Sequence, residues 1–189
     1  MSEQLSSTER EYLVNYLETT ARRFADTVES LTDEEWQATP AEAVWSPAQI
    51  SEHMVLTESR IARMLRTRLS PAGTAVSVED RERVDALILK RVPDRTPGRR
   101  RMEAPEPLHP ANRWPDRFAL LEEFRRHRGA TIAFVNDTEL PLRAHTAPHP
   151  MLGTLDGYQW ILFLGAHVER HVRQMEETCG RLTARRPPD

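Results

Sequence analysis

Apolar residues recur at spacings of three and four positions in four long stretches of the chain, with charged residues between them. This spacing is typical of helices that bury one face. In the first stretch, Leu13, Leu17 and Phe24 lie on the apolar side. The pattern predicts four long amphipathic helices, over residues 6–31, 47–69, 115–136 and 154–180.

Capping residues predict where two of the helices begin. Ser46, Pro47 and Gln49 combine an N-cap, a proline suited to the first helical position and a side chain that reaches back to the cap. Thr32 and Glu35 have the spacing of a capping box, which predicts a short helical turn before the second long helix. The second long helix therefore starts at a well-defined position.

The remaining boundaries follow from cap and turn residues. A short helix is expected over residues 77–91, and the last long helix is expected to begin after Thr154 and end at Gly180. No segment alternates apolar and polar residues with a period of two, so no strand is expected. Residues 93–114 and 140–153 are predicted to be loops.

The lengths of the connections bear on the topology of this all-α chain. The second and third long helices are separated by about 45 residues, far more than a plain up-down-up-down arrangement needs. This link can cross over the other helices and leave the second and third helices parallel, and it contains the short helix predicted over residues 77–91. We expect a single domain over residues 1–183, followed by a flexible tail over residues 184–189.

Composition narrows the location and the partners. The chain has 189 residues, a formal net charge of −3 and a single cysteine, Cys179. No disulfide framework is possible within one chain, the first ten residues are polar, and no apolar run is long enough for a membrane span. We therefore expect a cytoplasmic protein with no membrane partner.

A run of three arginines, Arg99–Arg101, lies in the first predicted loop. Such a run can bind phosphate or nucleic acid, but no aromatic residues are interleaved with it and the whole chain is acidic. We interpret the run as a solvated surface and expect no nucleic-acid partner.

Three histidines are candidate metal ligands. His167 and His171 are four residues apart on the last predicted helix, so their side chains lie about 40° from alignment and about 6 Å apart along the axis. His53 lies on the apolar face of the second long helix. Each imidazole left unpaired in a core would cost about 1–3 kcal/mol, whereas one shared cation would satisfy all three.

The type of ligand limits which metals could bind. Three neutral imidazoles suit Zn²⁺, Ni²⁺, Fe²⁺ or Cu²⁺, and do not suit Mg²⁺ or Ca²⁺. We take zinc as the default, with nickel or iron as alternatives. Three histidines leave a coordination position open for water or substrate. Cys179 lies about 12 Å beyond His171 by helical rise, so it is read as an inert apolar residue instead of a fourth ligand.

Four short motifs, in their order and spacing, resemble the DinB-like (DinB/YfiT) metalloprotein superfamily. The resemblance covers roughly residues 10–180 and is weakest around Arg99–Arg101. The motifs are WSPAQISEH at residues 45–53, APEPLHP at residues 104–110, His149-Pro150 followed by Gly153, and HVERHVRQ at residues 167–174.

The resemblance implies a four-helix bundle with up-down-down-up order and a divalent metal held by one histidine of the second helix and two of the fourth. These ligands carry over onto His53, His167 and His171. Many members are dimers, and characterised ones are thiol-dependent transferases or isomerases that use bacillithiol, mycothiol or glutathione. Others have no known activity.

Further residues are candidates for roles around the metal. Arg170 and Gln174 match the family pattern: Arg170 is a candidate for holding an anionic group or forming a structural salt bridge, and Gln174 for supporting His171 or packing. His149 and His109 lie on loops that can roof the site, where each is a candidate acid or base or an ordinary turn histidine. Arg170 and His149 are thus the candidate catalytic residues.

The leading hypothesis is a metal-dependent enzyme, similar to thiol S-transferases, that activates a low-molecular-weight thiol for attack on an electrophilic small molecule. We expect it to act as a homodimer. One alternative is a hydrolase that uses metal-bound water, with Glu52 or Glu169 as base. Another is a non-catalytic metal-binding or ligand-binding stress protein.

Overall fold

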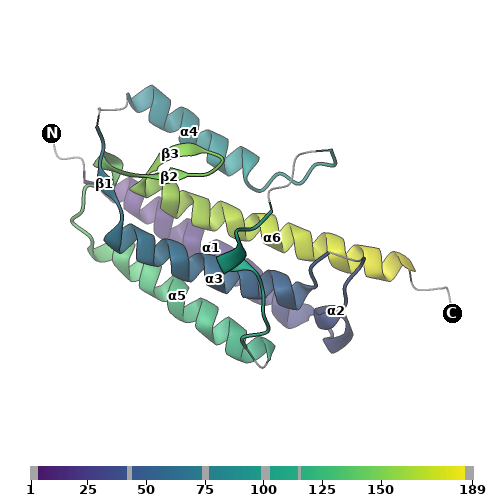
Figure 1. The fold of residues 1–189 in the computed structure, drawn as a ribbon. Helices are drawn as coiled ribbons and strands as arrows, with labels where there is room; N and C mark the ends of the chain where they lie inside the picture. The colour runs from purple at the N-terminus through teal and green to yellow at the C-terminus, as the bar shows by residue number, and fades with distance from the viewer. Residues whose placement is uncertain (1–3, 42–43, 74–76, 99–102, 115, 186–189) are drawn as a thin grey trace.

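Four long helices make up about half of the chain in the computed structural model, which describes residues 4–41, 44–73, 77–98, 103–114 and 116–185 (Figure 1). The short helices α2 (Asp33–Gln37) and α4 (Val78–Arg91) lie between them. The predicted helical fold class is therefore confirmed. The long helices are α1 (Ser7–Ser30), α3 (Pro47–Thr67), α5 (Arg117–Asp137) and α6 (Gly157–Arg185).

The predicted caps set the starts of α2 and α3. The side chain of Ser46 accepts a hydrogen bond from the backbone of Gln49, and the Gln49 side chain accepts one from the backbone of Ser46. Thr32 and Glu35 form the same reciprocal pair at α2. Both predicted capping boxes are confirmed. They satisfy backbone N–H groups that would otherwise lack partners at a helix start.

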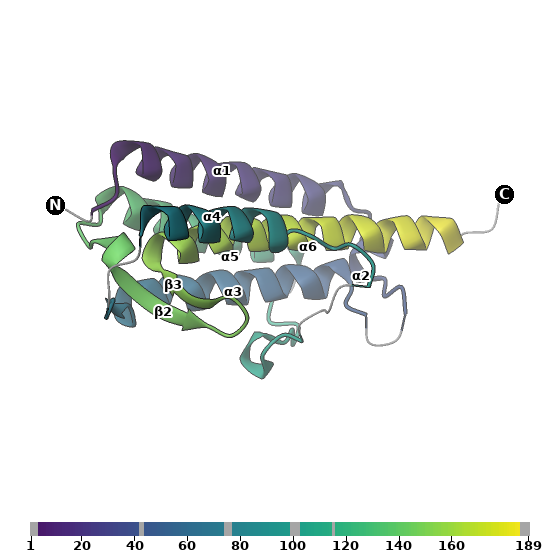
Figure 2. The ribbon, with the colours of Figure 1, turned by 90° about the horizontal axis from the view of Figure 1, so that it is seen from above.

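The packing of the long helices is visible from above in Figure 2, where α1 and α3 lie on opposite sides of α6. Both α1 and α3 pack against α5 and α6. Tyr16 contacts Gly165 in the first halves of α1 and α6, and Arg23 pairs with Glu176 in their second halves, so these two helices run in the same direction.

The helices α3 and α5 run together in the opposite direction. Arg128 in the middle of α5 binds Glu58 in the middle of α3, and Arg66 near the end of α3 donates to the carbonyl of Ala130 farther along α5. Arg10 at the start of α1 donates to the carbonyl of Asn136 at the end of α5, which makes α1 and α5 antiparallel.

The core consists of two apolar clusters that meet along α6. One cluster includes Leu164 and Ala166, and the other includes Val168 and Met175. His167 therefore lies on α6 where the two clusters adjoin. A polar group at that position has few places to find a partner, because apolar side chains surround it.

The prediction that the chain contains no strand is wrong. A small antiparallel sheet is formed by β1 (Ser70–Pro71), β2 (His145–His149) and β3 (Gly153–Asp156), with β2 in the middle. The strands β2 and β3 form a hairpin in the segment predicted to be a loop, preceded by a short 3-10 turn over Leu142–Ala144. These strands have two to five residues and β2 contains Pro148, so no period-two pattern could develop.

The expected boundaries of the last helix are also wrong. Thr154 lies in β3, and α6 starts at Gly157. The carboxylate of Asp156 accepts from the backbone of Gln159, and the Gln159 side chain accepts from the backbone of Asp156, so Asp156 provides the cap instead. Gly180 lies within α6, since a glycine inside a helix costs only about 1 kcal/mol.

The segment predicted to be a loop over residues 93–114 contains a 3-10 turn, η1 (Glu106–Leu108), which contacts α3. The run Arg99–Arg101, Pro115 at the expected start of the third helix and residues 186–189 of the expected tail lie outside the described residues. Among the helices that are described, none is long and apolar enough to cross a membrane.

Candidate metal centre

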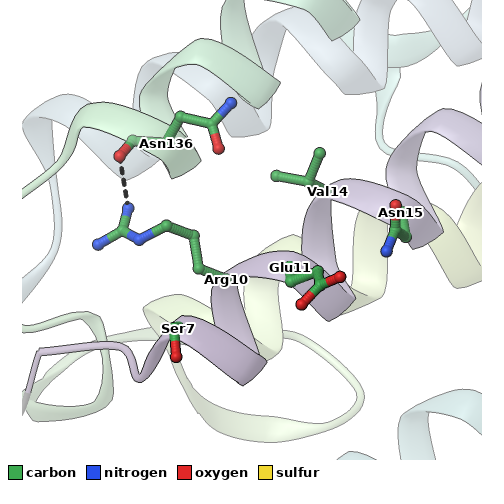
Figure 3. Close-up of a pocket in the computed structure, with 6 residues that line it drawn as sticks. All are labelled: Ser7, Arg10, Glu11, Val14, Asn15 and Asn136. Carbon is green, nitrogen blue, oxygen red and sulfur yellow. Dashed lines mark hydrogen bonds between the residues drawn. The ribbon is translucent and has the colours of Figure 1, made fainter.

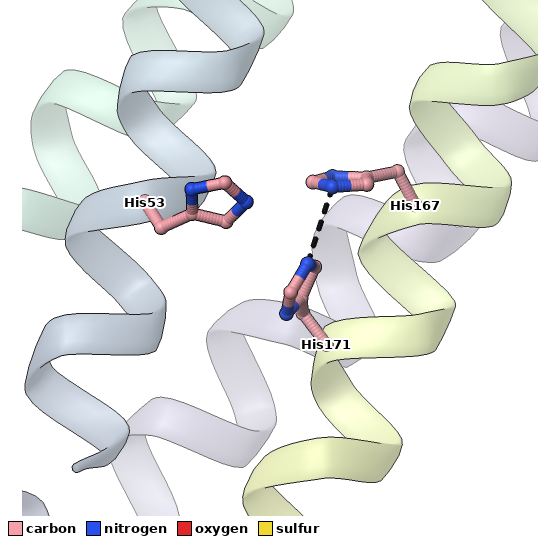
Figure 4. Close-up of side chains that lie close together, drawn as sticks. All are labelled: His53, His167 and His171. Atoms are coloured by element: carbon pink, nitrogen blue, oxygen red, sulfur yellow. Dashed lines mark hydrogen bonds between the residues drawn. The ribbon is translucent and has the colours of Figure 1, made fainter. Parts of the chain in front are cut away.

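The three predicted ligands converge between α3 and α6 (Figure 4). One ligand atom from each of His53, His167 and His171 lies within 4.8 Å of the others. The ring centroid of His53 lies 5.3 Å from that of His167 and 4.9 Å from that of His171. The structure therefore brings together the full set of candidate ligands named from the sequence.

The helices bring these rings together for reasons visible in the sequence. The Ser46 cap places His53 on the second turn of α3, and the 3.6-residue period puts His167 and His171 on one face of α6. Ser51 of α3 contacts the sulfur of Met175 at 3.6 Å, which sets the two antiparallel helices in register one turn away from the histidines.

Hydrogen bonds to protein carbonyls define the tautomers of two rings. His53 Nδ1 lies 3.0 Å from the backbone oxygen of Leu108, and His171 Nδ1 lies 3.0 Å from the side-chain oxygen of Gln174. Because a carbonyl oxygen only accepts, each Nδ1 must carry the proton. The Nε2 atoms of both rings are then left with a lone pair, which is the form that binds a metal.

His167 completes the donor set. Its Nε2 lies 3.1 Å from the Nε2 of His171, while its buried Nδ1 meets no partner within the described part of the chain. Protein groups alone therefore leave lone pairs and one ring nitrogen unsatisfied in an apolar surrounding. A divalent cation bound to three imidazole nitrogens fits this donor set.

Burial keeps the three rings neutral. It is the main cause that lowers the pKa of His53, and it lowers the pKa of His167 and His171 well below the usual range. For His167 and His171, the neighbouring histidines and Arg170 lower the pKa further because they disfavour a second positive charge. Neutral imidazole is the state that a metal requires.

Aromatic side chains enclose the cluster on two sides. The ring of Trp45 lies 5.2 Å from that of His53, and the ring of Phe163 lies 5.3 Å from that of His167. These walls exclude water from part of the site. A low local dielectric strengthens the interaction of any bound cation with its ligands.

His149 and His109, the two histidines expected on loops over the site, lie outside the three-histidine cluster. His149, at the end of β2, packs 4.7 Å from Phe163, and its Nδ1 accepts from the backbone of Met151 and Leu152. Burial lowers its pKa to about 4. His109 bonds the carbonyl of Ala104 at 2.7 Å. Both rings have structural hydrogen bonds and lie next to residues that contact the cluster.

Arg170, the other candidate catalytic residue, binds the backbone of the segment that follows α4. Its guanidinium donates to the carbonyls of Val92 and Asp94, at the end of α4. It is nevertheless close enough to lower the pKa of His167 and His171. The side chain thus contributes positive charge beside the cluster while it fixes the backbone that follows α4.

Glu52 and Glu169, the two carboxylates considered as bases, do not face the three histidines. Glu52 accepts hydrogen bonds from the backbone of Ala111 and Asn112 and from the side chain of Arg113. Glu169 lies two positions from both His167 and His171 on α6, about 200° around the helix, so its side chain points away from the face that carries the two imidazoles. Neither residue is placed as a base beside the histidines.

Sequence reasoning missed the carbonyl of Leu108 and the guanidinium of Arg95. Arg95 donates to the side-chain oxygen of Gln174 at 3.3 Å and forms two hydrogen bonds with Glu177. It is 79 residues from Gln174 in the sequence, and no local pattern links them. Only the HVERHVRQ motif pointed to Gln174 itself. Of the two roles considered for it, support of His171 or packing, the structure shows the contact with His171.

Two surface cavities lie away from the histidines. One, of about 490 Å³, lies between the start of α1 and the end of α5, where Arg10 reaches the backbone of Asn136 (Figure 3). The other, of about 190 Å³, lies where η1 meets α3, beside Leu108, Arg60 and Arg63. Neither is lined by His53, His167 or His171.

Comparison with known proteins identifies the relatives of this chain. The uncharacterized protein YuaE of Bacillus subtilis strain 168 is 25% identical over 150 residues, which cover 79% of this chain and 86% of YuaE. No solved structure matches the chain. A model of the DinB superfamily matches residues 16–175, a span that contains all three clustered histidines and most of the four long helices. The chain belongs to the DinB superfamily.

Proposed function

We propose that this protein binds a divalent metal ion through His53, His167 and His171 and uses it to activate a low-molecular-weight thiol for transfer to a small electrophilic substrate. The observation that carries the proposal is the convergence of three imidazoles, two buried and one partly buried, whose ligand atoms lie within 4.8 Å of one another. Two of them have Nδ1 bonded to a carbonyl and Nε2 free to coordinate.

The proposed chemistry divides between the metal and the protein. A divalent cation at this site supplies positive charge that lowers the pKa of a nearby thiol. Trp45 and Phe163 exclude water beside the ligands, and the carbonyl of Leu108 and the amide of Gln174 orient two of the rings. In the transfer, sulfur forms a bond to the substrate carbon and the leaving group departs with the bonding electron pair, while the thiol proton passes to solvent.

The choice of metal in this proposal is argued from the type of ligand. Imidazole nitrogen favours zinc, nickel and iron over magnesium and calcium. We propose zinc, because three histidines with an open position are typical of catalytic zinc sites. Nickel and iron are the alternatives.

The finer features of the family complete the proposal. We propose that the long helices form an up-down-down-up four-helix bundle, with residues 68–116 as the crossover, in a single domain over residues 1–183. The parallel pairs α1 with α6 and α3 with α5 support this order. We also propose a homodimer, in accord with the family resemblance. A cytoplasmic location is proposed because the chain has a single cysteine.

Thiol transfer is favoured over hydrolysis by the positions of the carboxylates. Hydrolysis by metal-bound water needs a base beside the site. Glu52 accepts hydrogen bonds from the 111–113 segment, and Glu169 lies on the side of α6 opposite His167 and His171. A thiol that ionises on binding does not require such a base.

Non-catalytic metal or ligand binding is the second candidate. The observation in its favour is that the three histidines line neither of the two cavities described above. A protein of this kind would retain a metal tightly and would not turn over any thiol. Turnover measurements therefore separate the two functions.

The test is a turnover assay with a panel of low-molecular-weight thiols and a generic electrophile. We expect a rate that depends on added metal and is lost in His171→Ala. The matched control is His127→Ala, because His127 pairs with Glu123 on α5 and lies outside the cluster. Equal rates in chelated and metal-loaded protein would reject thiol transfer, and tight metal retention without turnover would support the non-catalytic function.

A further inference from the structure

Arg95 lies in the segment that follows α4 and is held against α6. Its side chain is only 7% exposed, so its charge must be paired. Glu177 provides that pairing through two hydrogen bonds, at 3.0 and 2.8 Å. The third contact of the guanidinium, at 3.3 Å, is with the side-chain oxygen of Gln174.

The oxygen of Gln174 is shared between Arg95 and His171. It lies 3.3 Å from Arg95 Nη1 and 3.0 Å from His171 Nδ1. A guanidinium can only donate hydrogen bonds, so the amide must turn its oxygen, and not its NH₂ group, toward Arg95. The same oxygen then faces His171, whose Nδ1 must carry a proton to donate to it.

We propose that Arg95 is a positioning residue for the metal centre, which fixes the Gln174 amide and thereby holds His171 in the tautomer with Nδ1 protonated and Nε2 free to bind metal. This inference rests on the proposed metal site. It extends that site from its three ligands to a chain of contacts that runs from Glu177 through Arg95 and Gln174 to His171.

Loss of Arg95 removes the constraint on the amide. The Gln174 side chain can then rotate and present its NH₂ group to His171 Nδ1, which becomes an acceptor. In that tautomer the proton is on Nε2, the atom that faces His167 at 3.1 Å. Metal binding at Nε2 would return the proton to Nδ1, where it would face the NH₂ group and find no acceptor, so binding is weakened. Substitutions of groups that orient a metal ligand typically reduce affinity about 10–100-fold.

Arg173 offers a matched control. It also ties α6 to the segment after α4, because its guanidinium donates to the carbonyl of Pro93 at 3.2 Å. Within the described part of the chain, the Gln174 oxygen contacts Arg95 and His171, and Arg173 makes no hydrogen bond to that amide. Arg173→Met therefore removes one attachment of the segment and leaves the amide constrained.

The test is a titration of the full-length protein with Zn²⁺ in competition with a chromophoric chelator. We expect zinc affinity to fall about 10–100-fold in Arg95→Met and to stay within about twofold of wild type in Arg173→Met. In a Gln174→Glu background, loss of Arg95 should cost less than about threefold, because a carboxylate presents only acceptor oxygens to His171.

Two outcomes would overturn the role of Arg95. The first is equal zinc affinity in wild type and Arg95→Met. The second is that Arg95→Met lowers zinc affinity by the same factor in the wild-type and Gln174→Glu backgrounds. That result would assign the effect to the segment after α4 and not to the Gln174 amide. Wild-type protein that binds no zinc would instead contradict the proposed function, and the role of Arg95 with it.

A second measurement does not depend on the folding of any variant. Long-range ¹H–¹⁵N spectra of metal-free wild-type protein report which ring nitrogen of each histidine carries the proton. We expect His171 to be protonated at Nδ1. Protonation at Nε2 would overturn the inference whatever the variants show.

Discussion

The Nε2 atoms of His167 and His171 lie 3.1 Å apart, and the ring of Phe163 packs against that of His167. Two neutral rings this close share one proton or one cation. A metal that binds this native pair together with His53, and not the unfolded chain, stabilises the protein by mass action.

We therefore expect zinc to raise the Tm of wild-type protein and a chelator to reverse the change. At free zinc about 100 times the Kd, the gain is about 2.7 kcal/mol. His171→Ala should lose most of this gain, and His127→Ala, on α5, should keep it. Thermal unfolding with and without chelator checks the prediction, and an equal shift in His171→Ala and wild type would contradict it.

The buried ion pair between Glu58 and Arg128 predicts a large stability effect. The two side chains are 1% and 2% exposed, and Arg128 donates to both Glu58 oxygens. Arg128→Met leaves a buried carboxylate without its partner, which should cost about 3–5 kcal/mol. Glu58→Leu combined with Arg128→Met should recover much of the loss. Urea unfolding measures both, and a double variant as unstable as the sum of the single ones would refute the account.

Close packing of α1 on α6 predicts opposite effects at two glycines. A Cβ at Gly165 would lie 2.4 Å from the Tyr16 ring, whereas a Cβ at Gly129 on α5 meets nothing within 4 Å. Gly165→Ala should destabilise by about 1–3 kcal/mol through overpacking. Gly129→Ala should stabilise by up to about 1 kcal/mol through helix propensity. Urea unfolding measures both free energies. Changes of the same sign would show that the contact between Gly165 and Tyr16 does not limit how closely α1 and α6 approach.

Burial of the His149 ring should make the free energy of unfolding fall at acid pH. Burial lowers its pKa to about 4, below the ordinary value of about 6.5 in the unfolded chain. The unfolded state therefore binds a proton first, and the stabilisation that is complete above about pH 6.5 is lost as the pH falls toward 4. His149→Gln should reduce the slope of unfolding free energy against pH by up to about 1.4 kcal/mol per pH unit.

This slope is best measured in chelated protein, where the metal ligands titrate in both variants. Urea unfolding at several values between pH 7 and pH 4.5 gives the comparison. Identical slopes for wild type and His149→Gln would contradict the assignment of the shifted pKa to this ring.

Local signals in the sequence predicted the parts of the fold that depend on local contacts. The capping boxes at Thr32 and Ser46 involve residues three positions apart, so their partners are visible in the sequence. The position of His53 follows from the second of these caps. The helical period likewise placed His167 and His171 on one face.

Contacts between distant segments could not be predicted in this way. Pairing between β1 and β2 joins Ser70 to Thr146, and Arg95 reaches Gln174 across 79 positions. Neither segment carries a periodic pattern that identifies its partner. The carbonyl of Leu108 was equally hidden, because any residue supplies the same backbone oxygen.

The central claim is that His53, His167 and His171 together bind one metal ion. Elemental analysis of untagged wild-type protein and of His53→Ala tests it most directly, since His53 is the only one of the three from α3. We predict about one equivalent of a transition metal, with zinc favoured, in the wild type and a large loss in His53→Ala. Unchanged metal content in the variant would contradict the three-histidine site.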